Sequence, residues 1–404
     1  MPPHPQTTIR SRLFGAALVI AAFTLPLPVA WGSFALPLLL AAWLLGPDLR
    51  ARIRWIGQSA PAWLALVLLG LFFAAALWRR WPEQDALNFS MKYLKLCLLP
   101  IIIGGTQDPR TSRRALDAFL LGLGIEVLIS YLRASGIAAP FPDPNQRYIG
   151  LINHIAYGFM LAFGCYVLLW RALDRTASRR TRLLYATLAA AFCANLLLLN
   201  AGRSGYVEFF AVLLLLFVQR RGAKGVALGA ALGVVLLALA MQLSTTTRQR
   251  IVEIPSNLIA MREGNLDTSA GIRLEHYRRA LQLIRKHWLL GVGTGGFDAA
   301  YQSAFGADAQ MPTNNPENEY LLVVAQLGVL GGLVLFAWCI AMWRAASALP
   351  ARQRDPAQAL LVAMAMGCVF NSQLLDALEG RFFVVMLGVL LTMSRSAARG
   401  TVEG

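Results

Sequence analysis

The residues with the clearest chemical potential stand where a polar stretch meets a long apolar run, in NNPENEYLLVVAQLGVLG (314–331). The Glu317 carboxylate could act as a general base that accepts a proton from a sugar hydroxyl. The same stretch also fits an ordinary helix start. Asn315 would be the N-cap, Pro316 would take the first helical position, and Glu317 would lie in the first turn, where the helix dipole favours negative charge. The two interpretations are compatible.

Two arginines at the edges of apolar runs could bind an anionic group. Arg203 lies in LNAGRSGYVEF (199–209), flanked by small residues that would let an anion approach the backbone and a helix start. Arg147 precedes another run in PDPNQRYIGLINHIAYG (142–158). The alternatives are a snorkelling turn arginine for Arg203 and an interfacial anchor for Arg147. His154 fits a hydrogen-bonded core histidine better than a catalyst.

A third arginine, Arg273, belongs to a stretch with helical periodicity, AGIRLEHYRRALQLIRKHW (270–288). Its apolar residues recur at steps of three and four and predict one apolar face, made of Leu274, Tyr277, Leu281, Ile284 and Trp288. Arg273 falls at the edge of this face. Such a helix would lie on the outer membrane surface or roof a cavity between the membrane spans.

Two further motifs have simpler interpretations. The glycines of HWLLGVGTGGFD (287–298) imitate a nucleotide-binding loop, but no strand precedes them, so they indicate a tight turn after the helix. In DALEGRFF (376–383), Asp376, Glu379 and Arg381 are expected to form salt bridges within an outward turn.

Composition places these motifs in a membrane protein. Of 404 residues, 57% are hydrophobic and 14% are charged, whereas soluble domains have about 45–50% and about 25%. The net charge of +16 does not indicate nucleic acid, because the basic residues cluster in every second gap between apolar runs. The clusters are Arg10/Arg12, Arg50/Arg52/Arg54, Arg110/Arg113/Arg114, Arg171/Arg175/Arg179/Arg180/Arg182, Arg220/Arg221/Lys224, Arg344/Arg352/Arg354 and Arg395/Arg399. This positive-inside pattern predicts cytoplasmic termini.

Apolar runs of about 20 residues are long enough to span a bilayer, and they predict an all-α polytopic membrane protein with about twelve transmembrane helices. Residues 13–45 are too long for one helix, so Pro26 and Pro28 predict a tight hairpin between two short helices. The other predicted spans are 60–78, 86–104, 115–133, 150–170, 183–200, 204–219, 224–242, 319–343, 358–377 and 381–394.

One polar stretch divides the chain into three parts. Residues 1–242 would hold helices 1 to 9, residues 243–318 would form a large periplasmic loop that contains the amphipathic helix, and residues 319–404 would hold helices 10 to 12 and a cytoplasmic tail. The five cysteines lie within apolar runs, and the four histidines have no metal-ligand spacing. The candidate catalytic and binding residues are thus the polar and charged residues that the predicted topology places on the outward side.

The order of the motifs resembles that of a known family. A span-edge GRSG is followed by a long loop with GIRLEHYRRALQLIRKHWLLGVGTGGF, then by ENEYLLVVAQLGVLG and NSQLLDALEGRFF. This order is similar to that of the bacterial O-antigen ligase and O-antigen polymerase superfamily, and most like the ligases, over roughly residues 145–390. The resemblance implies a GT-C-like inner-membrane glycosyltransferase of lipopolysaccharide biosynthesis.

The resemblance also implies substrates and roles. The donor would be a glycan on undecaprenyl diphosphate and the acceptor lipid A–core, on the periplasmic side, among membrane lipids and without nucleic acid, cofactor or metal. Arg203 and Arg273, with Arg147 as a third candidate, would hold the diphosphate, because guanidinium groups stabilise a leaving phosphate. Family members usually carry a histidine before the asparagine, at the position where this chain has Glu317. Glu317 would activate or orient the acceptor hydroxyl, and Asn318 would support it by hydrogen bonding.

Two other functions remain open at this stage. A polymerase of the same superfamily would use the same donor but a growing glycan on undecaprenyl diphosphate as acceptor. A polyisoprenoid-lipid transporter would need polar residues along several spans and often has internal repeats. In this chain the ionisable residues cluster on the outward side, apart from Lys92, Lys95 and Glu126, which favours an enzyme over a transporter. A direct attack on the donor, opposite the leaving group, would invert the anomeric centre.

Overall fold

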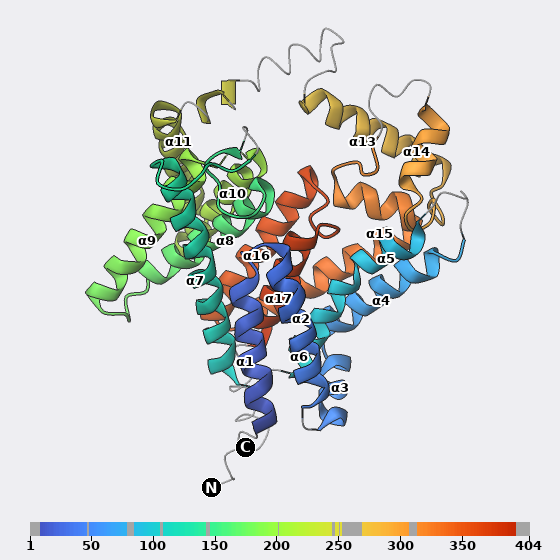
Figure 1. The fold of residues 1–404 in the computed structure, drawn as a ribbon, viewed down its shortest axis with the longest axis horizontal. Coiled ribbons are helices and arrows are strands. Elements are labelled where there is room, and N and C mark those ends of the chain that lie inside the picture. The colour runs from blue at the N-terminus through green and yellow to red at the C-terminus, as the bar shows by residue number, and fades with distance from the viewer. Residues whose placement is uncertain are drawn as a thin grey trace.

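The structure is a computed structural model that describes residues 9–46, 48–78, 85–105, 108–142, 146–200, 202–244, 247–249, 251–252, 269–306 and 313–392. Within these residues the regular secondary structure is helical throughout (Figure 1). The elements are α1 (Ile9–Thr24), α2 (Val29–Leu44), α3 (Leu49–Gly57), α4 (Ala60–Ala75), α5 (Ala86–Lys92), the 3-10 helix η1 (Leu94–Cys97), α6 (Leu98–Gly105), α7 (Pro109–Ala134), α8 (His154–Ala172), α9 (Arg179–Leu198), α10 (Arg203–Arg221), α11 (Ala223–Leu243), α13 (Ser269–Lys286), α14 (Phe297–Phe305), α15 (Glu319–Ser347), α16 (Ala351–Phe370) and α17 (Ala377–Thr392).

Every predicted span contains a helix, and the proline hairpin between α1 and α2 is confirmed. Six segments of the described chain are long and apolar enough to cross a membrane. They are Ala86–Gly105, Pro109–Ala134, His154–Ala172, Arg179–Leu198, Ala223–Leu243 and Glu319–Ser347, and a pair bent by 112°, α2 with α3, would make seven. The protein is therefore a multi-pass membrane protein, and a total of twelve spans stays a prediction.

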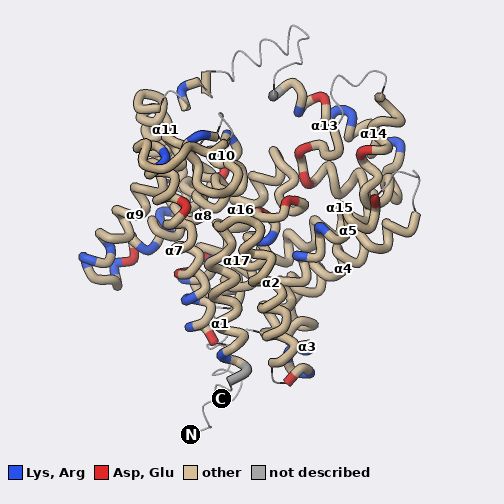
Figure 2. The backbone as a smooth tube through the Cα atoms, in the orientation of Figure 1, with Lys and Arg blue, Asp and Glu red and all other residues tan. Residues whose placement is uncertain are grey.

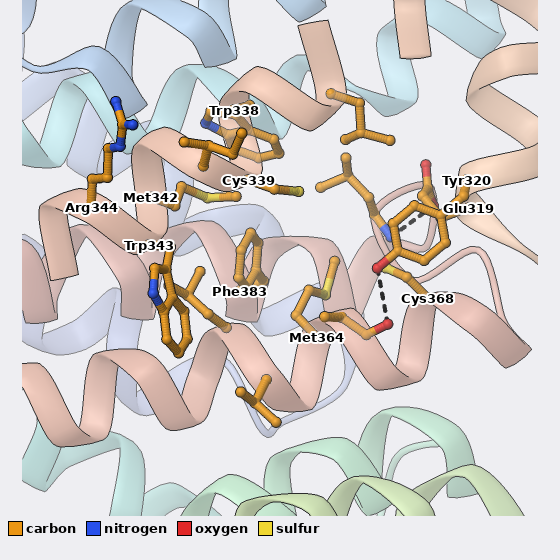
Figure 3. A pocket seen from close by; sticks show the side chains of 16 residues that line it. Glu319, Tyr320, Trp338, Cys339, Met342, Trp343, Arg344, Met364, Cys368 and Phe383 are labelled. Atoms are coloured by element: carbon orange, nitrogen blue, oxygen red, sulfur yellow. Dashed lines mark hydrogen bonds between the residues drawn. The ribbon is translucent and has the colours of Figure 1, made fainter. Parts of the chain in front are cut away.

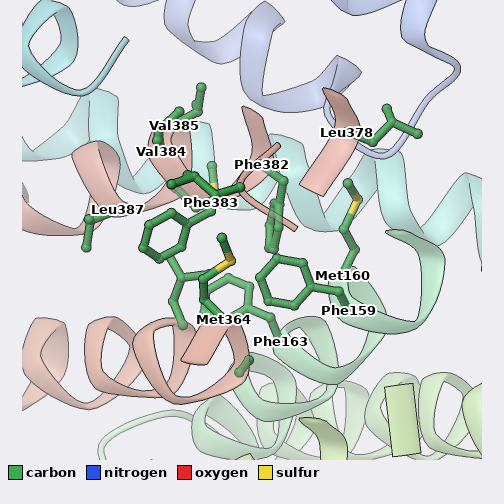
Figure 4. Close-up of a cluster of buried hydrophobic side chains, with 14 of the residues drawn as sticks. Phe159, Met160, Phe163, Met364, Leu378, Phe382, Phe383, Val384, Val385 and Leu387 are labelled. Carbon is green, nitrogen blue, oxygen red and sulfur yellow. The ribbon is translucent and has the colours of Figure 1, made fainter. Parts of the chain in front are cut away.

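The core of the molecule surrounds α17, whose side chains are buried on nearly every side. Phe382 stacks on Phe119 of α7 with ring centroids 5.0 Å apart, and it meets Phe159 of α8 edge-on at 5.0 Å (Figure 4). A helix that is buried on nearly every side occupies an interior position. Here α17 packs against α7, α8 and α16.

The packing of α11 against α10 follows from a stripe of small residues. Gly225, Gly229 and Gly233 recur every four residues, and a Cβ atom at Gly229 would lie only 3.1 Å from Leu214 of α10. Small residues at this spacing let two helices approach closely inside a bilayer. The other side of α11 exposes large apolar side chains such as Val234, which is the composition expected of a surface against lipid.

The two ends of the helical assembly differ in charge. The start of α7 and the end of α17 meet at one end, where the Ser112 and Thr392 hydroxyls lie 3.0 Å apart. Basic residues mark the lower ends of α1, α3, α7 and α9, whereas acidic and basic residues occur together near α13 and α14 (Figure 2). The candidate residues Arg273 and Glu317 therefore lie at the end opposite these basic clusters.

One predicted boundary is wrong and matters for the site. An outward turn was expected between the predicted spans 358–377 and 381–394, but α16 already ends at Phe370 and α17 begins at Ala377. The connection is therefore Asn371–Asp376, and Glu379 and Arg381 lie inside α17. The expected salt bridges within this turn do not form, because Arg381 donates to the Ala377 carbonyl at 2.8 Å and no ion pair among the described residues joins it to Asp376 or Glu379.

The glycine-rich stretch after α13 forms the predicted turn and also braces α15. Gly291, Gly293 and Gly295 have φ angles of 68°, 84° and 71°, which side chains rarely allow. The turn meets α15 where Gly328 breaks the helix with a φ of 65°. There the Val292 N–H donates to Ala325 at 2.8 Å and the Gly293 N–H donates to Gln326 at 2.9 Å. The glycine-rich turn and α15 are thus joined by hydrogen bonds between backbone groups.

Candidate functional site

Asn318, and not Asn315, caps α15, which corrects the predicted helix start. The Asn318 Oδ1 accepts a hydrogen bond from the Leu321 N–H at 3.0 Å, and its Nδ2 donates to the Val369 carbonyl at 2.9 Å. Glu317 lies before the helix, in a left-handed conformation with a φ of 53°. A non-glycine residue in this region is uncommon and is a frequent feature of functional sites. Its N–H is held by the Asn315 Oδ1 at 2.8 Å.

Glu317 forms an ion pair with Arg273 of α13. The Arg273 Nε lies 2.5 Å from the Glu317 Oε2, and both side chains are partly exposed, 34% and 43%. Tyr277, one turn along α13, donates to the Val369 carbonyl at 2.6 Å and reaches the Glu317 carbonyl at 3.3 Å. Burial raises the pKa of Tyr277, so its hydroxyl remains a donor at neutral pH.

The face that α13 turns to the protein differs from the predicted apolar face. Its buried residues are His276, Ala280 and Leu283, whereas Leu274 and Trp288 are exposed. The predicted face mixed two sides of the helix, because helical spacing alone does not say which apolar residues meet protein. Arg273, one turn before His276 and Tyr277, therefore lies on the inward side, as its contact with Glu317 requires.

His276 is a buried polar residue that sequence reasoning did not select. It is 6% exposed, its ring meets Tyr301 edge-on at 6.2 Å, and neither ring nitrogen has a hydrogen-bond partner within the described residues. Burial lowers its pKa, although the charge of Glu317 acts in the opposite direction. The signal that could have found it was its position three residues after Arg273, on the same helix face.

Arg203 and Arg147 belong to a second group, at the starts of α10 and α8. Arg203 is half-buried and is the first residue of α10, after the cap residue Gly202. A Cβ atom at Gly202 would lie 3.0 Å from both Cδ2 and the carbonyl of His154. The His154 N–H reaches the Gln146 Oε1 at 3.2 Å, and the exposed Arg147 follows Gln146.

The chain before α8 is held in place by two polar side chains of α7, the buried Glu126 and the partly buried Arg133. The Glu126 Oε2 accepts from the Leu151 N–H at 2.6 Å, and the Arg133 guanidinium donates to the Ile149 carbonyl at 2.9 Å. Both side chains lie on one face of α7, seven residues apart. Glu126, which lies within a predicted span, therefore has a structural role, because it binds the backbone of the segment that follows Arg147.

The α16–α17 connection links the two groups. The Ser372 hydroxyl donates to the Asn315 Oδ1 at 2.6 Å, so it contacts the residue that holds the Glu317 N–H. The Gln373 Nε2 donates to the Glu208 Oε1 of α10 at 2.6 Å. Glu208 lies five residues after Arg203, on the same helix.

An apolar groove of about 390 Å³ lies between α15 and α16 and ends beside this connection (Figure 3). Trp338, Met342 and Met364 line it, Leu374 belongs to the connection, and the Tyr320 hydroxyl crosses to the Ala365 carbonyl at 2.9 Å. An apolar cavity of this size suits a hydrocarbon chain better than a polar ligand. Among the described residues, no group of three His, Cys, Asp or Glu side chains could hold a metal ion.

The fold and the site together define a multi-pass membrane protein with a polar, arginine-containing site at one end of its helices. Residues 188–336 match the family model of O-antigen ligase. Over these residues, which are less than half of the chain, the protein is similar to the O-antigen ligase family. The match contains Arg203, Arg273, Glu317 and Asn318, whereas Arg147 precedes it. The search of curated proteins found no match.

Proposed function

We propose that this protein is an O-antigen ligase of the inner membrane, with both termini in the cytoplasm and its active site facing the periplasm. It would move a glycan from undecaprenyl diphosphate to lipid A–core by direct, inverting transfer. The observation that carries the proposal is the contact between Arg273 and Glu317, because it places a guanidinium group, which can bind phosphate, beside a carboxylate, which can accept a proton. The family match supports the substrate class, a lipid-linked glycan and a lipid acceptor.

The arginines would bind the donor diphosphate. Within the described residues Arg273 uses only its Nε for Glu317, which leaves the two Nη nitrogens for phosphate oxygens, since a guanidinium group has five N–H donors. Arg203 adds a second cation at the first turn of α10, where the helix dipole also favours an anion. Arg147 is the third candidate, on the segment held next to His154.

The transfer needs one bond to form and one to break. The acceptor hydroxyl oxygen attacks the anomeric carbon from the side opposite the diphosphate, so the configuration at that carbon inverts. Its proton passes to the Glu317 carboxylate, and the diphosphate leaves with the electron pair of the broken C–O bond, stabilised by the arginines. In this mechanism Asn318 keeps Glu317 in position through its cap of α15 and its bond to Val369.

The groove between α15 and α16 supports a substrate that carries a long hydrocarbon chain. It is apolar along most of its length and ends beside Glu319 and Leu374, close to the connection that reaches Asn315. The undecaprenyl chain would lie in this groove while its diphosphate reaches the arginines.

Acceptor dependence tests the proposal against the polymerase alternative. Purified protein would be given a donor on undecaprenyl diphosphate, with lipid A–core as acceptor, with and without a chelator. The ligase proposal expects glycan on lipid A–core at equal rates in both. Longer glycan that remains on undecaprenyl diphosphate would instead assign the polymerase reaction.

A further inference from the structure

We propose that the α16–α17 connection, Asn371–Asp376, holds the donor side and the acceptor side of the site in register, and that Glu319 and Lys95 are positioning residues that fix this connection. The inference rests on the proposed function for its kinetic consequences, but its structural content stands on contacts within the protein. Glu319 and Lys95 are proposed to act through the protein backbone, without contact with a substrate.

Glu319 holds the connection by its N–H groups. Its carboxylate is 1% exposed, and its Oε2 accepts from the Leu374 N–H at 2.9 Å and from the Leu375 N–H at 3.0 Å. Its Oε1 accepts from the Tyr93 hydroxyl at 2.9 Å. A buried carboxylate is costly unless it is hydrogen-bonded, and here each oxygen has a partner. Glu319 is also the first residue of α15.

Lys95 holds the same connection by its carbonyl groups. Its Nζ donates to the Leu375 carbonyl at 2.7 Å and to the Asp376 carbonyl at 2.5 Å. The Glu319 carboxylate therefore binds two backbone N–H groups of the connection, and the Lys95 amino group binds two of its carbonyl groups. Hydrogen bonds to charged groups are stronger than those between neutral groups, so this arrangement defines the backbone position of Leu374 to Asp376.

Ser372 and Gln373 directly precede this backbone segment, and their side chains contact opposite sides of the site. Ser372 holds Asn315 and through it the N–H of Glu317. Gln373 is fully buried and holds Glu208 of α10, the helix that begins with Arg203. The spacing between the proton acceptor and the donor cation therefore depends on one short segment, and an error of about 1 Å in such spacing can cost about a hundredfold in rate.

This arrangement predicts different kinetic effects for two neighbouring residues. Ser372→Ala removes the hydrogen bond to Asn315. We therefore expect kcat to fall at least about tenfold, while the KM for the donor changes less than about twofold. Gln373→Leu releases α10, so the donor KM should rise at least about fivefold. Ser112→Ala and Gln219→Leu are the matched controls, because they remove a buried serine contact with Thr392 and a glutamine contact between α10 and α16 away from the connection.

Hydrogen exchange gives a readout that does not require activity. In purified Glu319→Gln protein, amide exchange should accelerate in 371–376 and in 313–318, and it should remain unchanged in the Ser112→Ala protein. Unchanged exchange in both segments overturns the inference, whether or not the wild-type protein transfers glycan. If the wild-type protein transfers glycan and both connection variants match their controls, the inference fails while the proposed function stands.

Discussion

The Arg273 guanidinium and the Glu317 carboxylate meet at 2.5 Å although 44 residues separate them in the chain. The family resemblance implies separate roles for these residues, binding of the donor phosphate for Arg273 and activation of the acceptor hydroxyl for Glu317. Their contact means that the leaving group and the proton acceptor would lie side by side. An ion pair of two half-exposed side chains contributes little to stability, so its main consequence is expected in activity.

Removing either partner of this pair should reduce transfer strongly and non-additively. Arg273→Ala is expected to lower kcat/KM by about 10² to 10³, the usual cost of one transition-state donor. Arg273→Ala combined with Glu317→Gln should cost less than the product of the single effects, because the two residues act as a unit. Rates of glycan transfer from a double-mutant cycle measure this coupling. Arg278→Ala is the control, since its side chain is 72% exposed on the same helix. Fully additive effects would contradict the coupling.

Asn318 should matter for stability through its cap. Asn318→Asp keeps the oxygen that accepts from Leu321 but loses the Nδ2 donor to Val369, whereas Asn318→Ala loses both contacts. The alanine variant is expected to lose about 1 kcal/mol, the typical value of an N-cap. Thermal unfolding in detergent measures the difference between the variants. Equal melting temperatures for Asn318→Ala and wild type would show that the cap contributes nothing.

Burial of His276 predicts a loss of stability in acid. Its pKa in the folded protein is lowered from 6.5 by burial, so the unfolded chain binds more protons below that pH. Stability attributed to the neutral ring is therefore complete above about pH 6.5 and falls as the pH drops towards the lower folded pKa. Melting temperatures between pH 5 and 8 measure this slope, and His276→Gln should flatten it. An equal slope in the variant would assign the acid sensitivity to other groups.

Filling the groove between α15 and α16 should discriminate against long lipid carriers. Cys339→Trp places a bulky ring in the groove, so transfer from a donor with a full undecaprenyl chain should fall at least about tenfold. Transfer from a donor with a short, water-soluble chain should remain close to wild type. Phe336→Trp is the control on the same helix, because Phe336 is 65% exposed outside the groove. An equal loss with both donors would place the hydrocarbon chain elsewhere.

The all-helical class and the helices followed from the sequence because long apolar runs are local signals. The proline hairpin and the glycine turn after α13 were also predictable, because proline restricts the backbone and glycine permits the positive φ angles that the turn requires. The start of α15 was not. Asn315 and Asn318 are both good caps, and only the contacts of Ser372 and Val369 decide between them.

The connection Asn371–Asp376 shows why the rest of the site could not be predicted. The apolar Leu374 and Leu375 made this segment look like part of a span, and the polar Asn371, Ser372 and Gln373 were the only local sign of its end. Its role depends on Glu319 and Lys95, which contact it from distant parts of the chain. Such partners are set by tertiary packing, which one sequence does not report.

The central claim is that Arg203 and Glu317 carry glycan transfer from a lipid diphosphate. The most direct measurement is the rate at which purified wild-type, Arg203→Ala, Glu317→Gln and Arg278→Ala proteins transfer glycan from undecaprenyl diphosphate to lipid A–core. The account predicts that wild type and Arg278→Ala transfer at similar rates, whereas the other two lose at least about 99% of the rate, a loss of about two orders of magnitude. Normal transfer by both Arg203→Ala and Glu317→Gln would place the site elsewhere.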